Sequence, residues 1–316
     1  MGYLIWETFI QVAGVFLLAP LVAGIYENLK AKTEFRRGPS IFQPYYDLAK
    51  YLRKENSYTI ESALVYRWAP IVSFSVLFTI SFVIPVILPF PTMFAPMVDF
   101  LGGAMLFTLS SVILILGAIA SNNNLAIMGA SRSASFSALA EPTLILVFFS
   151  VALETGTDNP YITASFVSSG SSIYLSLTHL LSSVAFFMIF IFETGKLPVE
   201  SSGLSEMGMI DEGRSYEYGG RNLFFIKYGG YVKQFLLGSV LLNVFIFPWF
   251  MQTGLAGSVM DVFIMIGKWI ILILILVFME QVLAKVRLFK IADFLAISFT
   301  MSILALVMFI LGGFAL

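Results

Sequence analysis

The sequence predicts an all-α integral membrane protein with eight transmembrane helices, forming a single polytopic domain over residues 1–316. Three observations lead to this class. Of the 316 residues, 59% are apolar and only 12% are charged, about half of the roughly 25% usual in soluble domains. The mean hydropathy is +0.91. The apolar residues also gather in stretches of about 20, the length that a helix needs to cross the bilayer core.

Eight stretches meet this length requirement. They are Ile5–Tyr26, Ala69–Pro89, Leu101–Ala120, Ser135–Leu153, Ile173–Phe192, Lys233–Phe250, Met260–Met279 and Phe294–Gly313. The fourth is the weakest prediction because it is short and contains Glu141-Pro142. The seventh is the strongest, since it is almost purely aliphatic from Trp269 to Met279.

The basic residues predict the orientation in the membrane. Seventeen of the 18 Lys and Arg residues lie in the first, third, fifth and seventh connections or at their edges, and only Lys268 is inside a span. Cytoplasmic connections carry the excess of Lys and Arg, so these connections are predicted to be cytoplasmic and both termini to face outward. A wrong number of spans would disrupt this alternation, so the pattern also supports eight.

The first cytoplasmic connection, residues 27–68, is long for a structureless loop. Apolar residues recur at helical spacing after Pro44, among Asp47, Lys50 and Lys54. This pattern predicts an amphipathic helix that lies at the membrane surface or under a partner subunit. A basic helix that only senses anionic lipid remains the alternative.

The fifth connection, residues 193–233, is acidic. It is interrupted by Gly203, Gly208, Gly213, Gly219 and Gly220, which predict broken helix and tight turns. Large apolar residues such as Met207 and Tyr216 interleave with the acids, and a purely solvated loop has no need of them. We therefore expect a partly ordered segment that folds back on the membrane domain or packs under a soluble partner. Its carboxylates are Glu193, Glu200, Glu206, Asp211, Glu212 and Glu217.

Glu141 lies inside the fourth predicted span, where a charged side chain costs roughly 2.5–3.5 kcal/mol on insertion scales. Pro142 donates no backbone hydrogen bond, so an upstream carbonyl is free to hold water. A carboxyl next to a wettable backbone suits a proton relay, and a structural carboxyl paired with a basic residue is the alternative. Arg132 precedes Glu141 by nine residues, half a turn out of phase on a continuous helix, so pairing would require a bend.

Lys268 lies near the middle of the seventh span, where it cannot easily reach either surface. Asp261, seven residues earlier, lies on the same helix face, about 10 Å away along the axis. A relay role and a buried ion pair are both open for Lys268. His179 lies in the fifth span among Ser and Thr residues, where a proton-path role competes with that of a hydrogen-bonded packing group. Glu193 and Glu280 fall at cytoplasmic helix ends, where both could be solvated.

The absence of cysteine and the single histidine narrow the chemistry. They exclude disulfides, thiolate zinc sites, cysteine-ligated iron–sulfur clusters and bis-histidine haem in this chain. No glycine-rich phosphate loop is present, and a net charge of -1 offers no general attraction to nucleic acid. The N-terminus lacks a basic n-region, so no cleaved signal peptide is expected. Any redox cofactor must therefore be carried by another chain.

Several motifs in the two long connections stand out when they are taken together. They are Glu34-Phe35-Arg36-Arg37-Gly38-Pro39, Gln43-Pro44 with Asp47, Lys50 and Lys54-Glu55, Glu193-Thr194, Pro198-Val199-Glu200, and Glu217-Tyr218-Gly219-Gly220-Arg221. These motifs resemble one membrane subunit, the one next to the quinone chamber of respiratory complex I, whose counterpart serves in group 4 membrane-bound nickel–iron hydrogenases. Arg132 and Glu141 match an Arg…Glu pair of that family at the same spacing, and the eight spans agree. The resemblance covers nearly the whole chain.

The resemblance implies a subunit that anchors a soluble redox arm and provides the near end of a proton path leading to antiporter-like membrane subunits. On that analogy Glu141, Glu193, Glu200, Glu206 and Glu217 form the path, with Asp211, Glu212, Arg132, Lys268 and His179 as further candidates. The two long cytoplasmic connections would face the iron–sulfur subunit and a large catalytic-like subunit. The docking residues would be Arg36, Arg37, Gln43, Asp47, Lys50, Lys54 and Arg221.

One segment departs from the hydrogenase pattern. After Pro198-Val199-Glu200 the hydrogenase family continues Asn-Pro-Ala-Thr-His, whereas this chain reads Ser201, Ser202, Gly203, Leu204. The Pro and His are absent, which favours the related archaeal branch of membrane-bound sulfane or polysulfide reductases.

Our leading functional hypothesis is a non-catalytic plasma-membrane subunit of a respiratory oxidoreductase complex that couples electron transfer to proton or sodium translocation. The resemblance implies that iron–sulfur clusters belong to a partner subunit. Bound quinone is possible by the same analogy but is supported by no residue. A stand-alone secondary cation transporter is the first alternative, and it predicts a stable lone chain in mild detergent. A purely structural anchor is the second, and it predicts that neutralising Glu141 and Lys268 leaves coupling intact.

Overall fold

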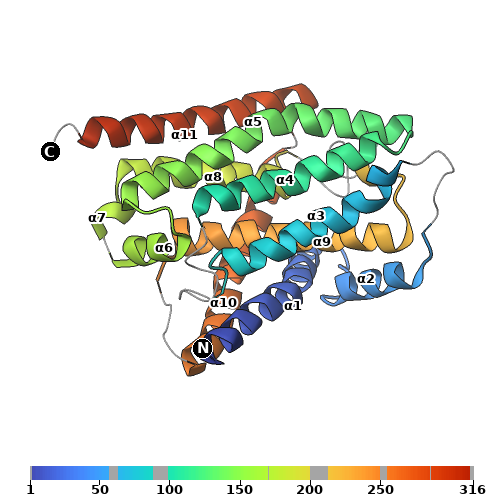
Figure 1. The fold of residues 1–316 in the computed structure, drawn as a ribbon, viewed down its shortest axis with the longest axis horizontal. Coiled ribbons are helices and arrows are strands. Elements are labelled where there is room, and N and C mark those ends of the chain that lie inside the picture. Colours follow the sequence, from blue (N-terminus) through green and yellow to red (C-terminus); the bar gives the residue numbers. More distant parts are fainter. Residues whose placement is uncertain are drawn as a thin grey trace.

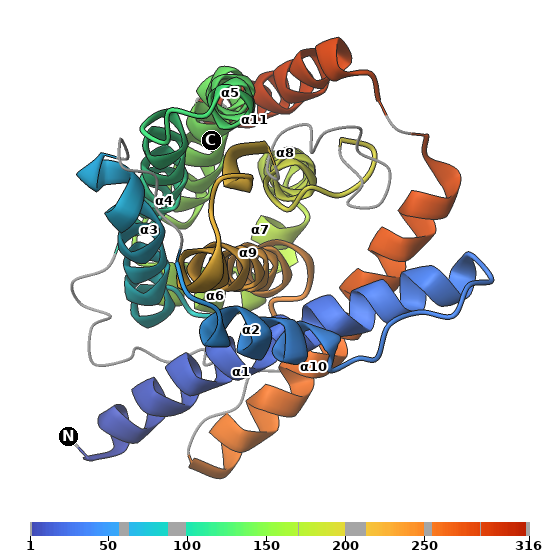
Figure 2. The same cartoon turned by 90° about the vertical axis from the view of Figure 1, so that its right-hand side faces the viewer.

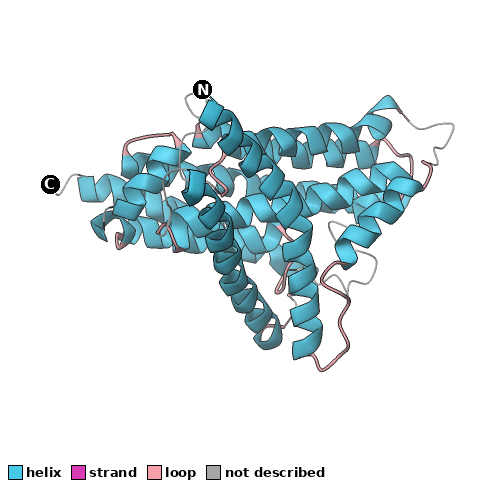
Figure 3. Cartoon of the chain, turned by 90° about the horizontal axis from the view of Figure 1, so that it is seen from below, coloured by secondary structure: helices cyan, strands magenta, loops and turns pink. Residues whose placement is uncertain are grey.

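The structure is a computed structural model that describes residues 2–56, 63–87, 99–169, 171–199, 213–249, 255–284 and 286–313. Within these residues every regular element is a helix, joined by loops and turns (Figure 3). The prediction of an all-α chain is therefore confirmed for the part of the chain that the structure describes.

Seven helical segments are long and apolar enough to cross a membrane. The helices that supply them are α1 (Gly2–Thr33), α3 (Leu64–Val83), α4 (Phe100–Ile119), α5 (Asn124–Thr155), α9 (Gly220–Val240), α10 (Leu255–Val282) and α11 (Ile291–Gly313). The fifth predicted span corresponds to α8 (Leu177–Glu193), an apolar helix of 17 residues. Seven of the eight predicted spans are thus supported by length and composition, and the eighth remains a prediction, as does the placement of the termini.

The helices form a bundle in which α3, α4, α5, α8 and α9 share one main direction. Figure 2 shows these helices nearly end-on, whereas α1 and α10 lie obliquely across them. α11 packs against α5 and α8 on one side, and α1 packs against α9 and α10 on the other. α9 occupies the centre, since 78% of its most apolar window is buried, against 22–44% for the other long helices.

Two ends of this bundle differ in the elements that cover them (Figure 1). The basic end carries α2 (Gln43–Arg53), the 3-10 helices η2 (Gly213–Ser215) and η4 (Leu288–Lys290), and the first turns of α9. The far end carries α6 (Pro160–Ser169), α7 (Ser171–Tyr174) and the π-helix η3 (Leu241–Ile246), which continues α9. The amphipathic helix predicted after the first span is confirmed as α2, whose residues Pro44 and Leu48 are buried.

Two predicted boundaries were wrong. The fourth span was expected to be short and to begin at Ser135, but α5 runs for 32 residues through Pro142 without a break. Asn123 caps its first turn by accepting a hydrogen bond from the Leu125 amide at 2.8 Å. The packing of α4, α8 and α11 against α5 provides neighbours that accommodate a proline inside the helix.

The sixth span was expected to begin at Lys233, but α9 begins at Gly220 and places Lys233 well inside the helix. A lysine near a predicted helix end is easily assigned to the adjoining loop, because an unpaired charge is costly inside a membrane. Here Lys233 has a carboxylate partner, which removes that cost. Arg221 and Lys227, also assigned to the fifth connection, lie in the first turns of the same helix.

Aromatic side chains fill the centre of the bundle. Phe148 on α5, Phe186 on α8 and Phe235 on α9 are fully buried in one continuous core. The ring of Phe235 stacks on Trp269 of α10, with centroids 5.2 Å apart. This apolar core separates the polar groups at the basic end from those at the far end.

Candidate functional site

A cavity of 280 Å³ lies at the basic end, where α1, α3, α4, α8, α9 and α10 meet. Its wall combines apolar side chains, such as Leu77 and Phe225, with an unusual number of charged groups for a membrane domain. The charged lining residues are Glu27, Glu193, Lys196, Arg214, Lys227, Lys233 and Glu280. Since charges inside a membrane protein mark ion pathways or partner sites, this cavity is the first candidate for function.

An ion pair between Glu193 and Lys233 forms the inner wall of the cavity. The Lys233 ammonium lies 2.5 Å from Glu193 Oε2 and also donates to the Ser111 hydroxyl at 2.6 Å. The two charged side chains are only 11% and 12% exposed. The pair therefore ties the C-terminal end of α8 to α9 and α4, and the alternative of a solvated Glu193 is wrong.

Glu141 of α5 lies beside this pair. The charges of both Glu193 and Lys233 act on its carboxylate, while its buried Oε1 has no hydrogen-bond partner among the described residues. The ammonium of Lys233 thus pairs with Glu193, and the carboxylate of Glu141 lies within electrostatic range of that pair with one unsatisfied oxygen. Such a group can accept a proton or a water molecule with little rearrangement. Arg132 does not pair with Glu141, since its guanidinium contacts the Met128 sulfur at 3.3 Å.

The turn after α8 places Lys196 at the cavity. Gly195 adopts a positive φ of 58°, and the Lys196 amide bonds back to the Ile191 carbonyl at 3.0 Å, as in a Schellman motif. The buried Lys196 ammonium lies over the Tyr26 ring, 3.4 Å from its centroid. Burial lowers the pKa of Lys196 to about 8, although the nearby carboxylates of Glu27 and Glu280 act to raise it.

Glu280 connects this turn to α1 and α10. Its carboxylate lies 3.2 Å from the Lys30 ammonium and accepts the Leu197 amide at 3.4 Å. The side chain is buried, so the alternative of a solvated Glu280 is also wrong. Lys196 and Glu280 therefore both line the cavity, where Glu280 joins the turn after α8 to α1 and α10.

Other predicted path residues lie apart from this cluster. Glu217 holds the start of α5, because its carboxylate accepts a hydrogen bond from Asn123 at 2.6 Å. Its carbonyl accepts the Tyr66 hydroxyl at 2.8 Å, so the described end of the acidic connection folds back on the bundle as expected. Glu200, Glu206, Asp211 and Glu212 lie outside the described residues.

Lys268 and His179 both lie at the far end. The Lys268 ammonium donates to Asn243 Oδ1 at 3.0 Å and to the Phe247 carbonyl at 2.7 Å, and Asp261 acts on its charge. His179 Nε2 lies 3.2 Å from the Phe245 carbonyl. Neither residue reaches the cavity at the basic end. Among the described residues, no group of three His, Asp or Glu side chains is arranged to hold a metal ion.

A family model described as NADH dehydrogenase matches residues 7–311. The chain belongs to the NADH dehydrogenase family. The match covers the whole bundle and confirms the resemblance drawn from the sequence motifs. Together with the seven apolar helices, it identifies a multi-pass membrane protein.

Two relatives from Escherichia coli (strain K12) extend this family assignment. Hydrogenase-4 component C is 26% identical over 98% of both chains. Formate hydrogenlyase subunit 4 is 30% identical over 88% of this chain and 90% of its own. Among solved structures, the archaeal membrane-bound sulfane sulfur reductase, a respiratory membrane complex, matches with a TM-score of 0.77. That match covers 96% of this chain and all of that chain at 20% identity, so it shows a shared fold.

The predicted docking residues of this family member gather on one exposed surface at the basic end. Arg36, Arg37, Lys50, Lys54 and Arg221 are exposed, whereas Gln43 and Asp47 are half-buried and hydrogen-bond to each other at 3.0 Å. The Asn222 amide donates to Asn56 Oδ1 at 3.1 Å, which holds the start of α9 against the end of the first connection. Residues far apart in sequence thus share one surface.

The sequence analysis did not predict the burial of four charged residues. Lys233, Lys196 and Glu280 are buried near the cavity, and Glu154 is buried at the far end. For Lys233 a sequence signal did exist. No proline lies between Gly220 and Lys233, so the helix could have been extended back to Gly220. For Lys196 and Glu280 no local signal exists, because their burial depends on a turn and a helix that meet only in three dimensions.

Proposed function

We propose that this chain is the membrane subunit of a multisubunit respiratory complex, in which it couples electron transfer in a neighbouring subunit to ion translocation. The support comes from two independent sources. The relatives named above are components of hydrogenase-type complexes, and the fold matches a subunit of a sulfane sulfur reductase complex. The cluster of Glu141, Glu193 and Lys233 gives this chain a group able to take up a proton.

The observation that carries the proposal is the unequal charge of that cluster. The single ammonium of Lys233 pairs with Glu193, and the charges of both groups act on the carboxylate of Glu141. An added proton neutralises the surplus negative charge, and a change of potential in the cavity shifts the proton's occupancy. A redox change at a partner docked on the basic end would alter the electrostatic potential at this cluster, by way of the charges of Lys196 and Glu280 in the cavity wall.

The exposed docking surface suits a soluble partner. Besides its arginines and lysines, this surface exposes large apolar side chains on and near α2, including Phe35, Phe42 and Tyr46. Protein interfaces favour this mixture of aromatic and Arg side chains. We propose that an iron–sulfur subunit binds here, that antiporter-like subunits adjoin the bundle in the membrane, and that the complex lies in the plasma membrane with the basic end cytoplasmic. On that arrangement α8 also crosses the membrane, which brings the number of spans to eight.

Quinone has no step in this proposal. Seven charged residues line the cavity beside apolar side chains such as Leu77 and Phe225, and this lining by itself assigns no quinone.

The test is the Glu141→Gln variant in the intact complex, purified through a tag on this chain and reconstituted into vesicles. Electron transfer is measured together with ion uptake by a fluorescent pH probe. We expect electron transfer to persist and translocation to fall by about a hundredfold, the lower range for loss of a positioned acid–base group. The matched control is Asp293→Asn, an exposed carboxylate at the basic end, which should behave as wild type.

Undiminished translocation in Glu141→Gln would overturn the relay role and leave the structural-anchor alternative. Recovery of the chain as a stable monomer without partners would instead favour a stand-alone transporter.

A further inference from the structure

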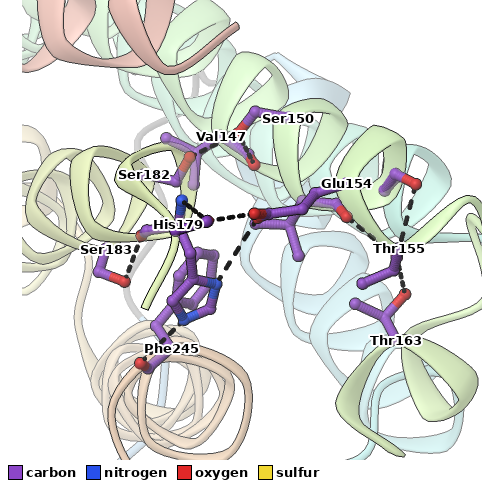
Figure 4. A network of polar contacts seen from close by, with 12 residues as sticks. Val147, Ser150, Glu154, Thr155, Thr163, His179, Ser182, Ser183 and Phe245 are labelled. Atoms are coloured by element: carbon purple, nitrogen blue, oxygen red, sulfur yellow. Dashed lines mark hydrogen bonds and ion pairs between the residues drawn. The ribbon is translucent and has the colours of Figure 1, made fainter. Parts of the chain in front are cut away.

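A second buried pair of titratable groups lies at the far end of the bundle. Glu154 is in the last turn of α5 and His179 is in the first turn of α8, and Figure 4 shows their side chains pointing toward each other. Glu154 Oε2 and His179 Nδ1 are 4.0 Å apart, and the two side chains are only 8% and 1% exposed. The pair is separate from the cluster around Glu141.

The two facing atoms are both without a hydrogen-bond partner among the described residues. The other carboxylate oxygen of Glu154 accepts a hydrogen bond from the Ser176 hydroxyl. The other ring nitrogen of His179, Nε2, lies 3.2 Å from the Phe245 carbonyl. Buried polar atoms are rarely left unsatisfied, so two that face each other call for an explanation.

The contact with Phe245 assigns the position of the imidazole proton. A carbonyl oxygen can only accept a hydrogen bond, so Nε2 must carry the hydrogen. In a neutral ring, Nδ1 then presents a lone pair to Glu154 Oε2. If Glu154 were ionised as well, two lone pairs would face each other in a dry site.

One added proton removes this conflict. Placed on Nδ1, it gives an imidazolium paired with a carboxylate; placed on Oε2, it gives a carboxylic acid that donates to neutral imidazole. The gap of 4.0 Å exceeds the usual 2.7–3.2 Å, and a small rotation of either side chain closes it. The site therefore holds one proton between two acceptors. Hard metal cations prefer oxygen ligands, so the nitrogen facing the carboxylate favours a proton over Na⁺.

Ser176 connects the pair to the surface of the far end. It is the N-cap of α8, it is half-buried, and its hydroxyl oxygen accepts the His179 amide at 3.0 Å while donating to Glu154. A hydroxyl that both accepts and donates can pass a proton between the carboxylate and solvent. The titratable groups at this end on the surrounding elements are Asp99, Asp158, Tyr161, Tyr174, Asp261 and Lys268.

A segment of buried apolar side chains separates this pair from the basic end. One turn deeper, Ser150 and Ser182 hydrogen-bond at 2.7 Å, and beyond them Phe148 and Phe186 are fully buried. Glu141 and Glu154 lie thirteen residues apart on α5, about 20 Å along its axis. One helix thus carries two buried carboxylates, Glu141 near its middle and Glu154 in its last turn, with apolar side chains between them.

We infer that Glu154 and His179 form a one-proton site that exchanges with the aqueous phase at the far end of the bundle, through Ser176. To take up a proton, Ser176 gives its hydroxyl hydrogen to Glu154 Oε1, the oxygen that it contacts, while its own oxygen takes a proton from the aqueous phase. Rotation of the protonated carboxyl group then presents the O–H to His179 Nδ1, and release reverses these steps. This inference rests on the proposed ion-translocating function, to which it adds a second site, nearer the far end of the bundle than Glu141.

The experiment uses the reconstituted complex with the pH set separately on the two sides of the vesicle. Translocation per electron should follow the pH at the far-end side with a single titration in the wild type. Glu154→Gln and His179→Gln should each remove that dependence and slow translocation by about tenfold or more. Ser183→Ala is the matched control, because Ser183 bonds the His179 carbonyl at 2.7 Å but does not titrate; it should keep the dependence.

Wild-type dependence on far-end pH in both Gln variants overturns the inference. If Glu154→Gln does not assemble, His179→Gln decides alone, with loss of the dependence supporting the site and retention overturning it. The Glu141→Gln variant distinguishes the two proposals. Translocation that survives in Glu141→Gln defeats the proposed function, whereas loss there with normal behaviour in the far-end variants defeats only this inference.

Discussion

Lys233 is the residue on which the charge balance of the cavity depends most directly. The substitution Lys233→Met keeps the length and apolar volume of the side chain and removes the ammonium. It leaves Glu193, which is 11% exposed, without its partner at 2.5 Å, and it leaves Glu141 beside a second carboxylate. Breaking a buried ion pair on one side costs about 3–5 kcal/mol, because the remaining charge is uncompensated. We therefore expect Lys233→Met to lower the free energy of unfolding by this amount.

Replacing the other partner, in Glu193→Gln, should lower the free energy of unfolding by less. It leaves Lys233 with Glu141 as a remaining carboxylate and Ser111 as an acceptor at 2.6 Å. The double variant Glu193→Gln with Lys233→Met removes both charges, and replacing a buried pair by neutral groups is often close to neutral in stability. The losses of unfolding free energy in the two single variants should thus add up to about 3 kcal/mol more than the loss in the double variant.

The assay follows the unfolding of this subunit in the purified complex in mixed micelles during a titration with a denaturing detergent, with wild type and variants measured side by side. Lys32→Met removes an exposed lysine at the end of α1 and serves as the control, with an expected change within about 0.5 kcal/mol. Additive single effects, or a change in Lys233→Met no larger than that of the control, would refute the reasoning that this pair is buried and shared.

The remaining predictions concern the turn after α8 and the centre of the bundle. Because the pKa of folded Lys196 is about 8, below the roughly 10.4 of an unfolded lysine, the unfolded chain binds more protons in between. The unfolding free energy should therefore rise with pH from about 8 to 10, by about 3 kcal/mol, and Lys196→Met should lack this rise in the same detergent titration. A Cβ at Gly238 would meet Trp269 at 2.2 Å, so Gly238→Ala should cost about 1–3 kcal/mol by overpacking. Gly230→Ala on the same helix meets nothing within 4 Å and should be neutral or slightly stabilising; equal thermal shifts in the two variants would contradict the packing.

Hydrophobicity predicted the helices well because a membrane helix must bury or expose about 20 apolar residues to lipid, whatever it packs against. The position of α2 was equally predictable from the sequence, since Pro44 lies in its first turn and the apolar spacing continues to Arg53. The ends of helices were harder to predict. The start of α9 at Gly220 and of α5 at Asn124 depends on charges and caps that are satisfied by distant residues.

Individual charges show the same division. Composition drew attention to Glu141 and Lys268, because an isolated charge in an apolar stretch is visible in sequence. Glu154 drew no attention, since it lies one residue from the predicted end of the span, where a carboxylate is expected in water. Its burial and its distance from His179 arise from the crossing of α5 and α8.

The sequence by itself determined the membrane class, the positions of most of the long apolar helices and the asymmetry of basic residues, because each depends on the composition of consecutive residues. Only the tertiary structure decided that Glu193 and Lys233 pair beside Glu141, that Lys196 stacks on Tyr26, and that Glu154 faces His179. The reason is physical. The energy of a buried charge is set by the atoms within a few ångströms of it. In this bundle those atoms come from helices far apart in the sequence, such as those of Ser111 and Lys233 or of Lys30 and Glu280.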